Sequence, residues 1–242
     1  MPRLRSAFPL GSPTWPDGVD RPPLERHTGL DYDTAWARRY GARVARAVFV
    51  DDVLRPLINL VGSPDVHGLD RLADLDEPAI FAANHHSHLD TGVILTSLPE
   101  RWRHKTVVAA ASDTFFTTRA MSAFSALTIG AIPIERHRVN RRSSDLVAEL
   151  LGEGWSLLIF PEGGRSPDGW ARDFRGGAAY LAVKCDKPVV PIYIVGTRAV
   201  LKKGKTLPAS VANPFRRGGP VKVNFGTPMR ASEGEDARRF AA

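Results

Sequence analysis

The stretch "AIFAANHHSHLDTGVILTSL", residues 79–98, decides the fold. It joins an apolar run rich in β-formers to a polar loop and then to a helix-like segment. The same alternation recurs along the chain. Further apolar runs lie at 105–112, 129–135, 155–160, 188–195 and 221–225, and further helix-like segments lie at 115–127, 143–154 and 176–185. Near-continuous apolar strands alternating with helices predict an α/β fold with a mostly parallel central sheet flanked by helices.

Two segments of different character precede this region. Residues 1–30 are rich in Pro, Gly and charge, and we expect a flexible tail. Residues 31–62 place apolar residues at helical spacing with arginines between them, which predicts an amphipathic two-helix segment divided at Pro56. Such a segment can lie on an anionic membrane surface, or pack on the domain with its arginines in solvent, and composition alone slightly favours packing. The α/β domain is then expected over residues 63–242.

The composition is that of a basic globular protein. The 242 residues include 33 Lys and Arg against 26 Asp and Glu, a formal net charge of +7. This excess points to anionic partners: nucleic acid, an acidic membrane surface or phosphorylated substrates. The single cysteine, Cys185, excludes an intrachain disulfide and any CxxC metal site, and it favours a reducing, intracellular setting.

No segment has the character of a targeting or membrane-spanning sequence. Prolines break the N-terminus, which lacks the apolar core of ~7–15 residues that a signal peptide needs. No run approaches the ~20 uninterrupted apolar residues that span a bilayer. We therefore expect a cytoplasmic protein, at most peripheral to a membrane. Nucleic acid is not an expected partner, because aromatic residues do not interleave with the basic clusters.

The polar loop "NHHSHLD", residues 84–90, has the composition of a metal site. His86, His88 and Asp90 have the spacing of metal ligands, and such a site would make the protein a metal-dependent hydrolase. Only two histidines follow, His104 and His137, and His137 lies among arginines that disfavour a cation. This makes metal the weaker interpretation of the loop.

The same loop also fits a general base and its orienting acid. His85 and Asp90 form a His-x-x-x-x-Asp pair, in which the carboxylate can fix the imidazole tautomer and stabilise the imidazolium. The base would deprotonate a substrate hydroxyl directly. Asp90 would equally suit an ordinary cap for the helix that follows. Taken by itself, the pair is weak evidence for a general base.

Three later segments place polar residues directly after or within apolar runs. They are "GAIPIER" (130–136), "FPEGGRSPDG" (160–169) and "VVPIYIVGT" (189–197). Glycine loops after strands let backbone N–H groups approach an anion, and arginine binds phosphate in bidentate fashion. Ordinary surface arginines and turn glycines would give the same pattern.

In this order and spacing the four segments resemble the glycerolipid acyltransferase family, whose best-known members are 1-acylglycerol-3-phosphate acyltransferases. The resemblance covers about residues 75–228. The matching positions of the family blocks NHxSxxD, strand-Glu-Arg, FPEGTRS and Val-Pro are Asn84, His85, Ser87, Asp90, Glu135, Arg136, Phe160, Pro161, Glu162, Gly163, Arg165, Ser166, Val190 and Pro191.

The resemblance implies a role for each site residue. His85 would be the base and Asp90 its orienting acid, with Asn84 and Ser87 bracing the loop. His86 and His88 would take no part. The acceptor phosphate would bind at a set of residues in the later blocks, namely Arg136, Glu162, Gly163, Gly164, Arg165 and Arg175. Gly164 replaces the usual Thr of the family, and Arg175 stands where many relatives have Lys.

The resemblance also implies the reaction and its partners. A fatty acyl group would move from acyl-CoA or acyl carrier protein to the hydroxyl of a lysophospholipid, with lysophosphatidate as the leading acceptor, in phospholipid biosynthesis. No metal and no other cofactor is expected. The family's paired N-terminal helices sit on the membrane and match residues 31–62. We therefore expect a peripheral protein at the inner face of the cell membrane.

Overall fold

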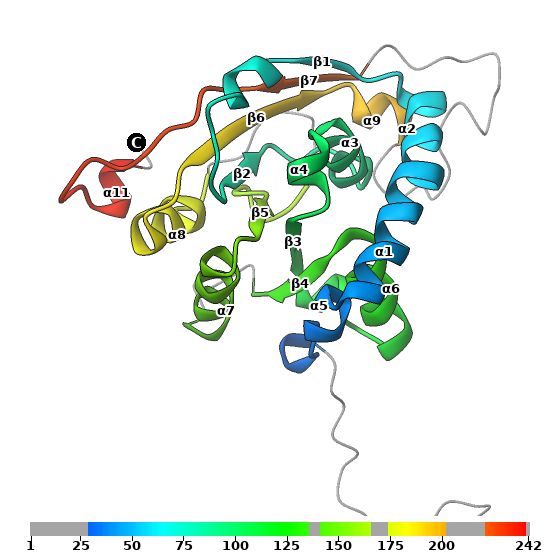
Figure 1. Cartoon of the computed structure of the whole chain (residues 1–242), viewed down its shortest axis with the longest axis horizontal. Helices are drawn as coiled ribbons and strands as arrows, with labels where there is room; N and C mark the ends of the chain where they lie inside the picture. Colours follow the sequence, from blue (N-terminus) through cyan, green and yellow to red (C-terminus); the bar gives the residue numbers. More distant parts are fainter. Residues whose placement is uncertain (1–28, 136–140, 166–173, 202–220, 241–242) are drawn as a thin grey trace, which may run out of the picture.

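The computed structural model of the chain describes residues 29–135, 141–165, 174–201 and 221–240. Its centre is a seven-stranded sheet with the strand order β1-β7-β6-β2-β5-β3-β4 (Figure 1). The strands are β1 (Asp65–His67), β2 (Ile80–Ala83), β3 (Thr106–Ala111), β4 (Ala131–Ile134), β5 (Ser156–Ile159), β6 (Val189–Val195) and β7 (Lys222–Phe225).

The sheet is parallel except where β7 joins it. The pairs β2–β5, β2–β6, β3–β4, β3–β5 and β1–β7 are parallel, whereas β6 and β7 are antiparallel. The prediction of a mostly parallel sheet is confirmed, and all six apolar runs form strands. The seventh strand, β1, was not predicted, because its sequence Asp-Val-His lacks an apolar run. It is held at the edge by pairing with β7.

Helices cover both faces of the sheet. The longer helices are α3 (Leu89–Ser97), α6 (Arg119–Ile129), α7 (Arg141–Gly152) and α8 (Gly177–Cys185). Short elements connect the rest: η1 (Gly29–Asp31), η2 (Ala35–Arg38), η4 (Leu69–Leu72), α4 (Glu100–Arg103), α5 (Ser112–Phe115), α9 (Thr197–Val200) and α11 (Ala237–Phe240). The helix predicted over 115–127 is divided, because Thr118 caps α6 by accepting a hydrogen bond from the Met121 N–H at 3.2 Å.

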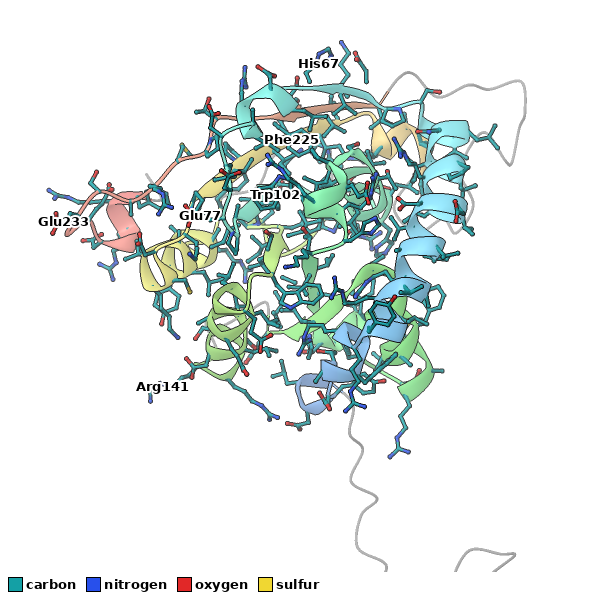
Figure 2. The ribbon with its side chains drawn as sticks, viewed as in Figure 1. His67, Glu77, Trp102, Arg141, Phe225 and Glu233 are labelled. Carbon is teal, nitrogen blue, oxygen red and sulfur yellow. The ribbon has the colours of Figure 1, made fainter. Side chains whose placement is uncertain are left out.

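Alternate residues of each strand pack into different layers, as the two-residue period requires. Phe81, Val108 and Leu158 belong to a core that includes residues of α2 and α3. Ile80, Val107 and Leu157 belong to a second core beneath α7 and α8. Figure 2 shows buried Trp102 and Phe225 inside the protein, whereas Arg141 extends outward from α7.

The N-terminal helical segment forms one rod. It comprises α1 (Tyr40–Val48), a π-helical stretch η3 (Phe49–Leu54) and α2 (Arg55–Gly62), drawn from blue to cyan in Figure 1. The backbone stays right-handed helical through both junctions. Pro56 lies in the first turn of α2, where the wider π-helical turn accommodates its ring and its missing N–H. The predicted helices are therefore present but join without a break.

The rod packs on the domain partly through an arginine. Arg46 is buried and donates hydrogen bonds to the carbonyls of Ala37 and Ala126 at 2.9 and 3.5 Å. Burial, together with repulsion from Arg43 and Arg38, lowers the pKa of Arg46 to about 10. The expectation that the arginines lie in solvent is wrong for Arg46.

An apolar stripe faces outward from the same rod. We call it the rod stripe, and it consists of Tyr40, Val44, Val48, Val53, Leu57 and Leu60. Tyr40 and Leu60 are 81% and 80% exposed. Among the described helices, none has both the length and the apolar character needed to cross a membrane.

Candidate active site

The polar loop that follows β2 lies beside the turn that follows β5. The two strands are parallel neighbours, with Phe81 opposite Leu158, so both chains leave the sheet at the same edge. In open α/β sheets, ligands bind in the crevice outside this carboxyl edge. The first and third sequence blocks therefore meet in space, although about seventy residues separate them in the chain.

His85 and Asp90 are in direct contact. Nδ1 of His85 lies 2.9 Å from Oδ2 of Asp90, and the side chains are 15% and 0% exposed. Oδ2 also accepts hydrogen bonds from the main-chain N–H groups of His86 and Ser87, at 2.6 and 2.8 Å. Since Oδ2 accepts from Nδ1, the neutral imidazole has its unprotonated nitrogen at Nε2. That nitrogen can accept a proton from a substrate.

The imidazole of His85 borders an apolar cavity. Its ring stacks on Phe160, with centroids 4.2 Å apart and planes 25° apart. The cavity, which we call the histidine cavity, has a volume of about 530 Å³. Its wall draws on the N-terminal rod, β3 and α6, and includes Leu54, Ile58, Val108, Phe124 and Ile129. A base thus stands at the edge of a space suited to an apolar substrate.

Glu162 is part of the support of His85. Its side chain is buried, and Oε1 accepts a hydrogen bond from the main-chain N–H of His85 at 2.9 Å. From the sequence we expected Glu162 to shape a phosphate pocket, and that role stays a prediction. The structure directs Oε1 to the backbone of the histidine loop.

Asn84 connects the loop to β6, and Ser87 connects it to the end of α9. The Asn84 amide donates to the Ile194 carbonyl at 2.8 Å and accepts from the Ile194 N–H at 2.7 Å, as a paired strand would. The Ser87 hydroxyl donates to the Leu201 carbonyl at 2.9 Å. Both side chains are buried. Each side chain thus connects the histidine loop to a later segment of the chain, and the bracing role stays a prediction.

The glycines and arginines of the later blocks divide between two places. Gly164 and Arg165 line the histidine cavity. Gly163 has a φ of +66°, and a Cβ added there would lie 2.9 Å from Nε of Arg175, so the guanidinium packs directly on the glycine. Arg175 borders a second cavity. Arg136 falls outside the described residues.

The other two histidines of the loop lie in different surroundings. His86 is buried, with Nε2 3.4 Å from the Asn84 amide nitrogen. His88 lines the histidine cavity and meets Phe115 edge-on, with centroids 5.9 Å apart. Burial lowers the pKa of His88, and the charges of Arg165 and His85 add to the effect.

The sequence led us to expect that His88 takes no part in the chemistry, and this stays a prediction. In the structure its side chain forms part of the wall of the histidine cavity. Among the residues that the structure describes, no group of three or more His, Cys, Asp and Glu side chains is placed to hold a metal ion.

Comparison with protein families matches residues 63–195, more than half of the chain, to the model described as Acyltransferase. A chloroplastic 1-acyl-sn-glycerol-3-phosphate acyltransferase of Brassica napus is 32% identical over 142 residues, which cover 58% of this chain and 39% of the relative. A counterpart from Arabidopsis thaliana is 30% identical over 173 residues, covering 71% of this chain and 45% of the relative. The chain therefore spans less than half the length of these curated relatives.

A solved structure shares the fold. It is the crystal structure of the 1-acyl-sn-glycerophosphate acyltransferase PlsC from Thermotoga maritima, with a TM-score of 0.60 and 23% sequence identity. The match covers 87% of this chain and 78% of that one. At this identity the likeness concerns the fold, namely the mostly parallel sheet and its flanking helices.

Proposed function

The chain belongs to the acyltransferase family, and we propose that it moves a fatty acyl group from a thioester to the hydroxyl of a lysophospholipid. The proposed donor is acyl-CoA or acyl carrier protein, and lysophosphatidate is the leading acceptor. The observation that carries the proposal is the contact of His85 with buried Asp90 at the edge of an apolar cavity. The curated relatives, whose names specify 1-acyl-sn-glycerol-3-phosphate as acceptor, support the acceptor class.

The dyad supplies the proton transfers of this reaction. Nε2 of His85 takes the proton of the acceptor hydroxyl as its oxygen attacks the thioester carbonyl carbon. Asp90 holds the ring in the productive tautomer and stabilises the imidazolium. The tetrahedral intermediate then collapses, the carbon–sulfur bond breaks, and the thiolate takes the proton from the imidazolium. The products are a new ester and a free thiol, and the base is restored.

The histidine cavity is the proposed place of the donor's acyl chain. Its apolar wall excludes water from the chain and brings the thioester carbonyl to His85. Met121 and Phe124 line it and are also 45% and 61% exposed. The cavity therefore extends to the surface at α6, which packs against α1 of the rod. A chain could enter there from a lipid surface.

The acceptor phosphate is assigned to the arginines of the later blocks. Arg165 lines the histidine cavity, and Arg175 packs on the adjacent Gly163. Two guanidinium groups near the base suit a phosphate, which arginine binds with paired hydrogen bonds. Arg136 remains a proposed third contact. Gly164 leaves out the hydroxyl of the usual Thr and is the proposed source of any difference in acceptor choice.

The rod stripe is the proposed contact with the inner face of the cell membrane. Monomeric proteins seldom expose a continuous row of large apolar side chains to water. Here the row lies along one helical rod, with Tyr40 and Leu60 near its ends. A net charge of +7 adds attraction to anionic lipids. We propose peripheral binding on the cytoplasmic side.

The test is thiol release from acyl-CoA and acyl carrier protein with a panel of acceptors: lysophosphatidate, glycerol 3-phosphate and lysophosphatidylcholine. We expect acceptor-dependent release with lysophosphatidate, and its loss in His85→Ala. His67→Ala is the matched control, because His67 is an exposed histidine on β1. Release with none of the acceptors, or full activity in His85→Ala, would refute the proposal.

A further inference from the structure

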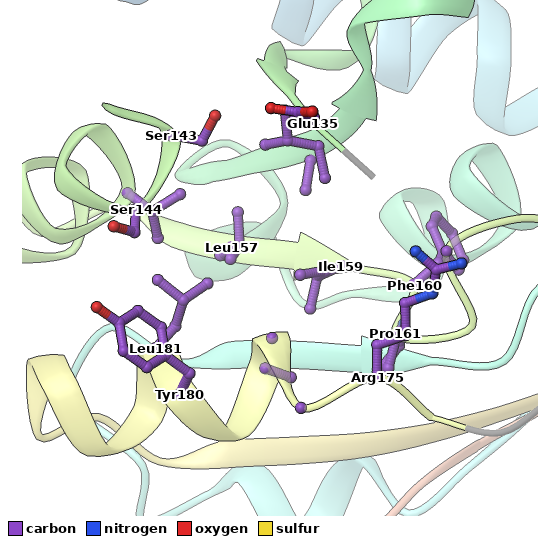
Figure 3. Close-up of a pocket in the computed structure, with 17 residues that line it drawn as sticks. Glu135, Ser143, Ser144, Leu157, Ile159, Phe160, Pro161, Arg175, Tyr180 and Leu181 are labelled. Carbon is purple, nitrogen blue, oxygen red and sulfur yellow. The ribbon is translucent and has the colours of Figure 1, made fainter. Parts of the chain in front are cut away.

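We propose that a second apolar cavity, on the opposite face of the sheet from the histidine cavity, holds the acyl chain of the lysophospholipid acceptor. This assignment rests on the proposed function. We call this space the α7–α8 cavity, because it lies between these two helices and the sheet (Figure 3).

The α7–α8 cavity has a volume of about 400 Å³, within the ~300–1,000 Å³ typical of ligand pockets. Most of its wall is apolar, from strands β3, β4 and β5 and helices α7 and α8: Ala109, Ile134, Val147, Leu157, Ile159 and Leu181. Gly176 and Gly177 complete the wall at the start of α8, and a Cβ added to either would meet nothing within 4 Å. Neither glycine contributes a side chain to the space.

The two cavities meet at the carboxyl ends of β3 and β4 and at the loop after β5. Ala109, Ile134, Phe160 and Gly163 line both of them, and Phe160 also stacks on the ring of His85. Leu157 faces only the α7–α8 cavity and Val108 only the histidine cavity, as expected for opposite faces of the sheet. Ligands in the two cavities would therefore approach the same base from different sides.

The chemistry of each cavity assigns the two substrates. His85 borders the histidine cavity, so the chain whose carbonyl carbon reacts belongs there. The α7–α8 cavity instead has Arg175 where it meets the loop after β5. An apolar space with a guanidinium at its head suits a single-chain anionic amphiphile. The lysophospholipid acceptor is such a molecule, with its phosphate at Arg175 and its chain under α8.

Figure 3 shows that the charged end and the apolar end of the α7–α8 cavity lie apart. Arg175 lies beside Pro161 and Phe160, at the end near the base, whereas Tyr180 and Leu181 lie at the other end. Glu135 is placed beside Ser143 on the α7 side, away from Arg175. Tyr180 is 37% exposed, so the far end reaches the surface. A chain longer than the cavity can extend past it.

Filling the cavity provides the test. Gly177→Leu places a side chain in the open space at the first turn of α8, where leucine is compatible with a helix. Gly152→Leu is the matched control, because a Cβ there also meets nothing within 4 Å but the residue lies at the exposed end of α7. Ala178→Val, on the same wall, replaces Gly177→Leu should that variant not fold.

The kinetic readout is the KM for lysophosphatidate with hexanoyl and with palmitoyl chains. Each methylene excluded from an apolar site weakens binding about fourfold, so displacing two raises KM roughly fifteenfold. We expect this rise for the palmitoyl acceptor in Gly177→Leu, with little change for the hexanoyl acceptor or for the donor. Equal effects of Gly152→Leu, or a change confined to the KM of the acyl donor, would overturn the assignment.

A binding measurement separates this inference from the proposed function. Calorimetric titration with dodecyl phosphate, below the concentration at which it forms micelles, needs no catalysis. We expect Gly177→Leu to weaken binding about fifteenfold relative to the wild type and Gly152→Leu. If no acceptor is acylated but this difference is seen, the proposed function fails and the cavity still binds an alkyl phosphate. Equal binding by all three proteins overturns the inference.

Discussion

Oδ2 of Asp90 lies 2.9 Å from Nδ1 of His85 and, at the same time, accepts two main-chain hydrogen bonds from the loop that joins them. One buried oxygen thus shapes the loop and orients the imidazole. All three hydrogen bonds go to Oδ2, and a carboxylate in this position offsets the cost of forming an imidazolium beside it. A change at this oxygen is therefore expected to alter both the conformation of the loop and the orientation of the base.

Replacing Asp90 is expected to remove most of this assistance. Asp90→Asn should lower the rate of acyl transfer by ~10²–10⁴-fold, the usual range for a general base, because the imidazolium loses its negative partner. His85→Ala should cost a similar factor, and the double variant little more, since the residues act as a unit. The measurement is kcat for thiol release, with melting temperatures as a control for folding. Additive losses would contradict a dyad.

Glu162 is expected to act through the position of His85. Glu162→Ala leaves the His85 N–H without its buried acceptor, which should destabilise the fold by ~1–3 kcal/mol and lower kcat. Glu162→Gln keeps an acceptor oxygen and should retain more activity. The KM for the acceptor separates the alternatives: a raised KM with normal kcat would place Glu162 in acceptor binding instead.

Gly163 should not tolerate a side chain. Gly163→Ala combines a φ of +66° with a Cβ only 2.9 Å from Nε of Arg175, so we expect a loss of ~1–2 kcal/mol in the free energy of unfolding and a displaced guanidinium. Gly152→Ala, with open space and an ordinary backbone, is the control for stability. Equal melting temperatures for both variants would show that the contact with Arg175 imposes no constraint.

His88 predicts a pH dependence of stability. Burial, then Arg165 and His85, hold its pKa below 6.5, whereas Asp90 acts in the opposite direction. The unfolded chain therefore binds the proton more tightly, and stability is lost as the pH falls below about 6.5. His88→Gln should remove the contribution of this histidine to the pH dependence of stability. The wild type should therefore become less stable relative to the variant on acidification. Denaturant unfolding at several pH values measures it; a constant difference would contradict the shift.

The rod stripe should determine binding to vesicles. Tyr40→Ser combined with Leu60→Ser removes the most exposed apolar side chains of the rod and should greatly reduce co-sedimentation with anionic vesicles. Asn59→Ser changes an exposed polar residue of the same rod and should bind as the wild type does. Unchanged binding by the double variant, or binding abolished by moderate salt alone, would indicate that lysines and arginines elsewhere make the contact.

The order of strands and helices followed from the sequence because it depends on local periods. Six apolar runs and their helical crossovers predict a parallel sheet, since successive strands joined by helices run in the same direction. The approach of His85 to Asp90 was also predictable, because only a short loop separates them. The strand β1 was not predictable from the sequence, because its three residues have no apolar alternation and pairing with β7 holds it in the sheet.

Contacts between distant segments were decided by the tertiary structure alone. The hydrogen bond from His85 to Glu162 depends on the register of β2 against β5, which no local pattern encodes. Burial of Arg46, and with it the outward direction of the rod stripe, depends on which helix face finds the carbonyl acceptors of Ala37 in η2 and Ala126 in α6. The α7–α8 cavity arises only when small residues from separate elements meet. A sequence sets periods and short loops, whereas packing determines which of the resulting faces touch.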